Sequence, residues 1–190
     1  MKQNMRFTVR EIAYVALFTA LLAVCAWISI PVGEIAFTMQ TFAVFAAVGL
    51  LGARRAVVCI VAYILVGAVG APVFSNFTGG LGVLFGATGG YIIGFIFTAL
   101  LTGTLMKRIP DSLGKGWTML LQALAMTAGL AVCYAFGTAW FILVYAPRAA
   151  KSVTVLGALS ACVFPYILPD LLKIALALGL CRRLSPHIRL

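Results

Sequence analysis

Six long apolar stretches limit what this chain can fold into. They cover about residues 12–30, 35–53, 55–71, 84–106, 117–143 and 153–181. A helix that crosses a membrane needs about 20 apolar residues. Hydrophobic residues make up 64% of the 190 positions and charged residues 9%, which excludes a soluble globule and a disordered chain. The sequence therefore predicts an all-α polytopic membrane protein with six transmembrane helices, in a single domain over residues 1–190.

Helix-breaking residues separate several of these stretches. Pro31 and Gly33 lie between the first two, and Gly52 precedes two arginines between the second and third. Residues 110–116, which begin with proline and end with glycine, separate the fourth from the fifth. Proline and glycine at such positions favour helix ends and turns.

The basic residues lie almost entirely at the ends of the apolar stretches, which predicts the topology. With six crossings, eleven of the fourteen fall on one side: Lys2, Arg6, Arg10, Arg54, Arg55, Lys107, Arg108, Lys115, Arg182, Arg183 and Arg189. Arg148 and Lys151 fall on the other side, and Lys173 lies within the last stretch. Because cytoplasmic loops are rich in Lys and Arg, both termini are expected to be cytoplasmic. The net charge of +10 is then explained by topology and contact with the lipid bilayer, without a nucleic-acid partner.

No pattern in the chain predicts catalysis or a bound cofactor. The phosphate-binding pattern G-x-x-x-x-G-K-[ST] is absent, so the chain is not expected to hydrolyse ATP. The single histidine, His187, lies in the basic tail, and the five cysteines are scattered, which gives no metal site. Only one carboxylate, Asp170, lies within an apolar stretch, whereas an intramembrane aspartyl protease needs two.

Asp170 and Lys173 are the strongest candidates for a functional site. Charged residues inside a membrane helix cost roughly 2.5–3.5 kcal/mol each on insertion scales, so they tend to be functional. Their i, i+3 spacing places both side chains on one face of a helix. In one interpretation they only neutralise each other. In the other they face a cavity, where the carboxylate accepts hydrogen bonds from ligand N–H groups and the amine donates to a ligand acceptor.

Residues 70–91 form a second candidate, because they are rich in glycine and carry no charge. Irregular backbone at membrane depth is tolerated where it is buried in protein or lines a cavity, which predicts a segment that contacts a ligand. The alternative is that these glycines only allow close helix packing. Asn76 in this segment and Gln40 in the second stretch are candidates for recognising an amide, although interhelical hydrogen bonds are the more common use of such residues.

Small residues recur on the first stretch at Ala13, Ala16, Ala20 and Ala23. Such a stripe allows another helix to approach closely, either within the protein or from a partner.

Five segments together resemble the BioY family, the biotin-specific substrate-binding (S) components of energy-coupling factor (ECF) transporters. They are residues 37–42 (FTMQTF), 67–74 (GAVGAPVF), 79–82 (GGLG), 86–91 (GATGGY) and 168–173 (LPDLLK). The chain departs from the family where an alanine replaces the usual proline of the fourth segment, and where Asn76 replaces a small residue.

The resemblance implies a protein of a prokaryotic cell membrane that captures biotin from outside with high affinity and uses no cofactor. It implies docking on a transmembrane coupling subunit and two ATPase subunits through the first helix, here at Ala16 and Ala20. The ureido group of biotin is expected to contact Asp170, Asn76 and Gln40. The apolar parts of biotin are expected to contact aromatic side chains. Lys173 is expected to contact either the ureido oxygen or the carboxylate of biotin, and the sequence does not distinguish the two. The full predicted site is Asp170, Lys173, Asn76, Gln40, Tyr91, Thr38, Gly82, Gly86, Phe74 and Trp27.

A self-sufficient secondary transporter with Asp170 as a proton relay is the alternative function. Such carriers often contain inverted repeats, and no convincing repeat relates residues 1–95 to residues 96–190.

Overall fold

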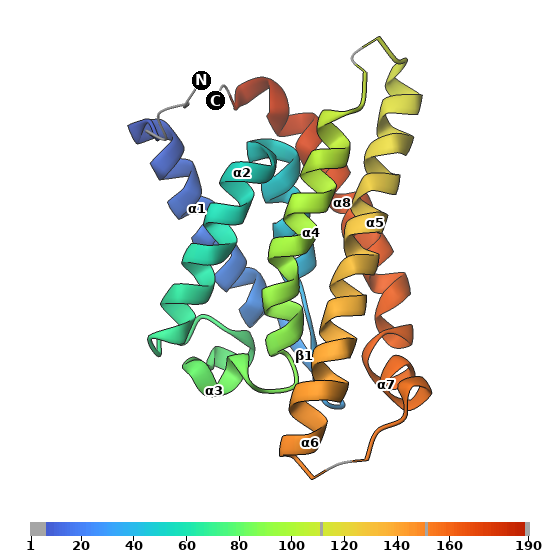
Figure 1. The fold of residues 1–190 in the computed structure, drawn as a ribbon. Helices are drawn as coiled ribbons and strands as arrows, with labels where there is room; N and C mark the ends of the chain where they lie inside the picture. The colour runs from blue at the N-terminus through green and yellow to red at the C-terminus, as the bar shows by residue number, and fades with distance from the viewer. Residues whose placement is uncertain (1–6, 111, 151, 189–190) are drawn as a thin grey trace, which may run out of the picture.

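The computed structural model of this chain describes residues 7–110, 112–150 and 152–188. Its elements, in chain order, are α1 (Val9–Trp27), β1 (Ser29–Val32), β2 (Ile35–Thr38), α2 (Gln40–Ala68), η1 (Ser75–Phe77), α3 (Leu81–Leu84), α4 (Gly89–Lys107), α5 (Lys115–Trp140), η2 (Phe141–Tyr145), α6 (Ala146–Arg148), α7 (Val155–Cys162), α8 (Phe164–Leu184) and η3 (Ser185–His187). The long helices lie side by side in one bundle, and α1 begins at the end of the molecule where α8 ends (Figure 1).

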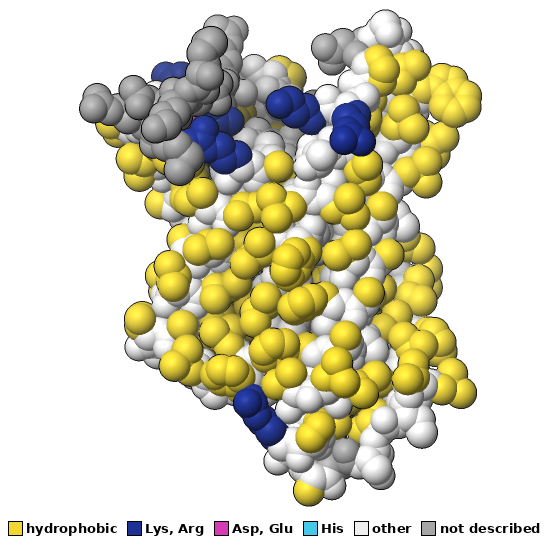
Figure 2. Space-filling model, in the orientation of Figure 1, with side chains coloured by type: hydrophobic (Ala, Val, Ile, Leu, Met, Phe, Trp, Pro, Cys, Tyr) yellow, Lys and Arg dark blue, Asp and Glu magenta, His cyan; other side chains and the backbone are white. Residues whose placement is uncertain are grey.

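The outer surface of the bundle suits a lipid environment. Among the described residues, five helices are long and apolar enough to cross a membrane: α1, α2, α4, α5 with its continuation to Arg148, and α8. Large side chains such as Leu17, Leu65 and Leu168 are 60–70% exposed, as expected for side chains that face lipid rather than water. Figure 2 shows hydrophobic side chains over most of one face between the two ends of the molecule.

The second and third predicted stretches form one element, α2, which folds back on itself. Gly52 has φ 78° and ψ 168°, a left-handed conformation that glycine adopts without steric cost. A straight helix would place Gln40 and Tyr63 about 34 Å apart. Instead the Gln40 Nε2 atom donates to the Tyr63 hydroxyl at 2.7 Å. The predicted break at Gly52 is therefore present, and α2 has two arms that run in opposite directions.

The prediction of an all-α fold was wrong for residues 29–38. These residues form an antiparallel hairpin in which Ser29 pairs with Thr38 and Val32 pairs with Ile35. Gly33 adopts φ 67° in the two-residue turn, as the tightest hairpins require. Because the hairpin is as apolar as its neighbours, hydropathy alone predicted its second strand, β2, as the start of the next helix.

The last predicted stretch, residues 153–181, is divided into α7 and α8. The break lies at Val163, where φ is −125° and ψ is −58°. Pro165 explains it, because proline within a helix clashes with the carbonyl four residues earlier but fits the first turn.

The described basic residues gather at one end of the molecule. Figure 2 shows Lys and Arg side chains at the end where α1 begins and α8 ends, whereas Arg148 belongs to α6 at the opposite end. Glu11 pairs there with Arg55 of the α2 turn. Lys2, Arg6, Lys151 and Arg189, which also enter the predicted charge distribution, lie outside the described residues.

Gly103 of α4 contacts the backbone of the α2 turn, and we expect Gly103→Ala to destabilise the fold. A Cβ atom there would lie 2.7 Å from the Ala53 Cα atom and 2.9 Å from its nitrogen. Overpacking of this kind costs about 1–3 kcal/mol. Gly179→Ala in α8 is the control, because nothing lies within 4 Å of its added Cβ. Thermal unfolding in detergent should show a loss for Gly103→Ala alone; equal melting temperatures would contradict the contact.

Candidate functional site: a polar cavity in the helix bundle

The charged pair predicted from the sequence forms one buried ion pair. The Lys173 Nζ atom lies 2.7 Å from the Asp170 Oδ1 atom, and the two residues are 4% and 3% exposed. Both residues lie on the same face of α8, as the i, i+3 spacing predicts. The pair therefore carries no net charge into the interior of the bundle.

Two other helices hold the Asp170 carboxylate. The Thr41 hydroxyl of α2 donates to Oδ1 at 2.9 Å, and the Tyr134 hydroxyl of α5 donates to Oδ2 at 2.5 Å. Together with Lys173, the carboxylate accepts three hydrogen bonds from three different helices. Since a carboxylate has about four lone-pair positions, one further donor can be accommodated.

Lys173 connects α8 to the hairpin. Its Nζ atom donates to the Thr38 carbonyl at the end of β2, at 2.6 Å, and lies 3.9 Å from the centre of the Phe37 ring. An ammonium group over an aromatic face is stabilised by the ring quadrupole. The amine is therefore held by a carboxylate, a carbonyl and a ring.

The pair lines a cavity of about 60 Å³, which we call the polar cavity. Its walls come from the hairpin, α2, α4, α5, α7 and α8, and its lining residues are Ile35, Ala36, Thr38, Gln40, Thr41, Ser75, Thr88, Tyr91, Ile92, Phe95, Cys133, Tyr134, Cys162, Tyr166, Asp170 and Lys173. This volume is well below the roughly 300–1,000 Å³ of typical ligand pockets. A vitamin-sized molecule therefore requires the walls to move apart.

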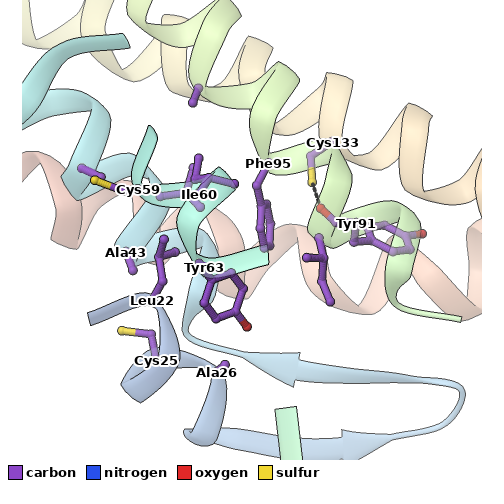
Figure 3. Packing of buried hydrophobic residues seen from close by; sticks show 14 of the residues in the cluster. Leu22, Cys25, Ala26, Ala43, Cys59, Ile60, Tyr63, Tyr91, Phe95 and Cys133 are labelled. Carbon is purple, nitrogen blue, oxygen red and sulfur yellow. Dashed lines mark hydrogen bonds between the residues drawn. The ribbon is translucent and has the colours of Figure 1, made fainter. Parts of the chain in front are cut away.

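Another wall of the cavity is formed by residues of α4 and α5. Figure 3 shows Tyr91, Phe95 and Cys133 close together, with the Cys133 thiol donating to the Tyr91 carbonyl at 3.8 Å. The Tyr91 hydroxyl lies 3.0 Å from the Thr138 hydroxyl. The cavity thus has a charged side on α8 and a largely aromatic and apolar side on α4.

Five of the predicted site residues line the polar cavity: Asp170, Lys173, Gln40, Thr38 and Tyr91. Gln40 also makes the interhelical hydrogen bond that was its alternative interpretation, since it donates to Tyr63 and its Oε1 atom accepts from the Thr38 hydroxyl at 3.1 Å.

The structure does not bring Asn76, Trp27 and Phe74 into the lining of the cavity. The Asn76 Oδ1 atom accepts from the Ser29 hydroxyl at 3.0 Å, so it joins η1 to the hairpin. Trp27 donates to the Pro72 carbonyl at 2.8 Å on the outside of the bundle. Phe74 is fully buried and packs edge-on against Tyr63, with 5.4 Å between ring centres. Each has a structural partner elsewhere.

Gly82 and Gly86, also predicted, lie outside the lining as well. Gly82 is in the one-turn helix α3, and Gly86 follows it, with its amide donating to the Val83 carbonyl at 3.0 Å. The predicted irregularity of residues 70–91 is present, because only η1, α3 and the start of α4 are helical there. This segment reaches the cavity through Ser75, Thr88 and Tyr91 instead.

Thr41, Tyr134 and Tyr166 are cavity residues that the sequence analysis missed. The Tyr166 hydroxyl donates to the Ile35 carbonyl of the hairpin. A polar hydroxyl inside an apolar stretch was the available signal, but it does not say which distant charge the hydroxyl meets. Among the described residues, no group of three His, Cys, Asp or Glu side chains is arranged to hold a metal.

Ala16 and Ala20, the predicted partner-binding residues, are exposed on α1 and line an apolar groove of about 550 Å³ between α1 and the second arm of α2. Thr19 in the same groove donates to the Cys59 carbonyl of α2 at 3.2 Å. Ala16, Ala20, Ala23 and Ala62 are among the residues that line the groove, and such small side chains leave room for another helix.

A bundle of apolar helices around a buried ion pair and a small cavity is typical of multi-pass membrane proteins with an internal site for a small molecule. The chain belongs to the BioY family, whose model matches residues 1–189.

Similar proteins support this membership. A biotin transporter BioY of Thermotoga maritima is 37% identical over 93% of this chain and 96% of its own length. A probable biotin transporter BioY of Pyrococcus horikoshii is 36% identical over the same shares. The crystal structure of the S-component for biotin from an ECF-type ABC transporter has a TM-score of 0.78 and 25% identity, and the match covers 95% of both chains.

Proposed function

We propose that this chain is the biotin-binding S component of an ECF-type uptake transporter in a prokaryotic cell membrane. The buried Asp170–Lys173 pair in the lining of the polar cavity carries the proposal, because charges are retained inside a membrane protein mainly for function. The names of its relatives point to the same ligand. The chain binds and delivers its ligand without chemical change and without a cofactor.

The proposed topology has six crossings in a single domain, with both termini in the cytoplasm. The two arms of α2 count as separate crossings because the chain reverses at Gly52. The gathering of Lys and Arg at the end where α1 begins supports the cytoplasmic assignment of that end (Figure 2). The hairpin, α3 and α7 then face outside, and residues of the hairpin and of α7 line the polar cavity.

The polar groups of the cavity complement biotin. Its ureido ring offers two N–H donors and one carbonyl, and Asp170 has room for one more donor. Gln40 and the hydroxyls of Thr38 and Tyr91 supply neutral hydrogen-bonding groups nearby. The apolar thioether ring and tail suit the side formed by Ile92 and Phe95. For biotin to enter, the hairpin must move away from α8.

Titration calorimetry of the purified chain with biotin, thiamine and riboflavin tests this function directly. Of the three ligands, we expect only biotin to bind. We expect Asp170→Asn to weaken biotin binding by about 1.5–3 kcal/mol, or roughly 10–150-fold, because a hydrogen bond to a charged group is lost. Glu11→Gln is the matched control, since Glu11 pairs with Arg55 far from the cavity.

Thermal unfolding of each variant accompanies the titration. An Asp170→Asn protein that is folded and binds biotin as tightly as the original chain would remove Asp170 from the site. Binding of thiamine or riboflavin in place of biotin would overturn the proposed ligand.

A further inference from the structure

A second cavity, of about 250 Å³, lies between the start of α5 and the end of α8. Its polar lining consists of Lys115, Thr118, Gln122, Arg182 and Ser185, and we call it the basic cavity. Arg182 lies nine residues after Lys173 in α8, or about 13 Å along the helix, so the basic cavity is separate from the polar cavity. The lining residues Met106, Lys115 and Arg182 of the basic cavity come from the end of α4, the start of α5 and the end of α8, which lie at the same end of the molecule (Figure 1).

The two cations of the basic cavity have no acidic partner among the described residues. In the described part of the chain, Glu11 pairs with Arg55 and Asp170 pairs with Lys173. The Arg182 guanidinium contacts the Met119 sulfur atom at 3.0 Å. Topology alone requires positive charge at this end, but it does not require two cations to line one cavity.

The remaining groups of the cavity favour an anion with several oxygen atoms. α5 begins at Lys115 without a side-chain cap and without an acidic residue in its first turn, so the positive end of its dipole near Lys115 is not neutralised by the helix itself. A guanidinium group matches two oxygen atoms of a phosphate at once, and an ammonium group adds a point charge. Ser185 and Gln122 offer further neutral donors.

The neighbouring surface indicates where this anion comes from. Trp117, in the first turn of α5, is 65% exposed, and Leu120 is 47% exposed. Exposed tryptophan at the end of an apolar helix is typical of the headgroup level of a bilayer. Lipid headgroup phosphates lie at this level of a bilayer, and basic cavities between transmembrane helices bind anionic headgroups.

We propose that the basic cavity binds the headgroup phosphate of an anionic phospholipid through Lys115 and Arg182. The phosphate supplies the negative charge that no described acidic side chain supplies there, and it joins the start of α5 to the end of α8.

Native mass spectrometry of the delipidated full chain in detergent tests this site, with phosphatidylglycerol and phosphatidylcholine as probes. We expect one saturable site that prefers phosphatidylglycerol. The double variant Lys115→Gln with Arg182→Gln should weaken that binding about tenfold or more, because charged hydrogen bonds to the phosphate are lost. The double variant Lys107→Gln with Arg183→Gln has the same net charge and alters cations at the same end that are outside the cavity lining, so it should bind normally.

A second arm titrates inorganic phosphate, and biotin binding and the melting temperature report on folding. If inorganic phosphate competes with phosphatidylglycerol in the original chain but not in the Lys115/Arg182 variant, the site takes phosphate from solution as well as from lipid. If both double variants lose phosphatidylglycerol binding equally, the binding depends on net charge and not on the basic cavity, which would overturn the proposal. Failure of both phosphate probes would also overturn it, and would favour an acidic segment of a partner protein at this place.

Discussion

Lys173→Met should lower the free energy of unfolding by about 3–5 kcal/mol, the cost of removing one partner from a buried ion pair. The variant leaves the Asp170 carboxylate 3% exposed, with only the Thr41 and Tyr134 hydroxyls to compensate its charge. Thermal or denaturant unfolding in detergent measures the loss. Arg183→Met, one residue past Arg182 on the exposed end of α8, is the control and should change stability little.

Adding Asp170→Asn to Lys173→Met separates the two interpretations of the pair. The double variant has no buried charge, so most of the lost stability should return. If the pair serves ligand binding, the restored protein still fails to bind biotin. If the double variant binds biotin like the original chain, the two residues only neutralise each other and the proposed site is wrong. A double variant as unstable as Lys173→Met would show that the carboxylate charge is not the cause of the loss.

The second large effect concerns the apolar groove on α1. Ala16→Trp should abolish uptake of biotin by cells that contain the complete transporter while binding in detergent stays unchanged. The added indole fills the groove that Ala16 and Ala20 leave open, and a helix can no longer approach. Ala16 does not line the polar cavity, so ligand affinity should not fall.

Leu17→Trp is the matched control for this experiment. Leu17 is the next residue of α1, is 60% exposed and lies outside the groove. Normal uptake by both variants would contradict docking through this face. Uptake by the chain alone in vesicles with a pH gradient, without ATPase subunits, would instead favour the proton-coupled alternative in which Asp170 relays protons.

Local signals in the sequence predicted the parts of the fold that depend on nearby residues. The break at Gly52 follows from the conformational freedom of glycine, and the joint orientation of Asp170 and Lys173 follows from helix periodicity. The hairpin was missed because its residues are apolar and its two-residue turn differs little in sequence from a break between helices. The division at Val163 was missed because the residues directly before and after it are apolar.

The candidate site was less predictable because distant segments build it. Thr41 and Tyr134 meet Asp170 across separations of 129 and 36 residues, and no local pattern records such a meeting. Conversely, the side chains of Asn76 and Trp27 could hydrogen-bond a ligand, but they make their hydrogen bonds with Ser29 and Pro72 instead. Chemistry was therefore predictable residue by residue, whereas the choice of partner depended on the tertiary fold.

The Lys173 amine donates a hydrogen bond to the Thr38 carbonyl, so a ligand that binds the amine must replace this carbonyl as its acceptor. In the proposed entry of biotin, the hairpin moves away from α8, so the ammonium would lose one oxygen neighbour and an incoming carbonyl or carboxylate could replace it. A molecule that lacks such an oxygen leaves the ammonium short of an acceptor in a dry interior, which costs about 1–3 kcal/mol or more. The contact between Lys173 and the hairpin would therefore disfavour ligands that are entirely apolar.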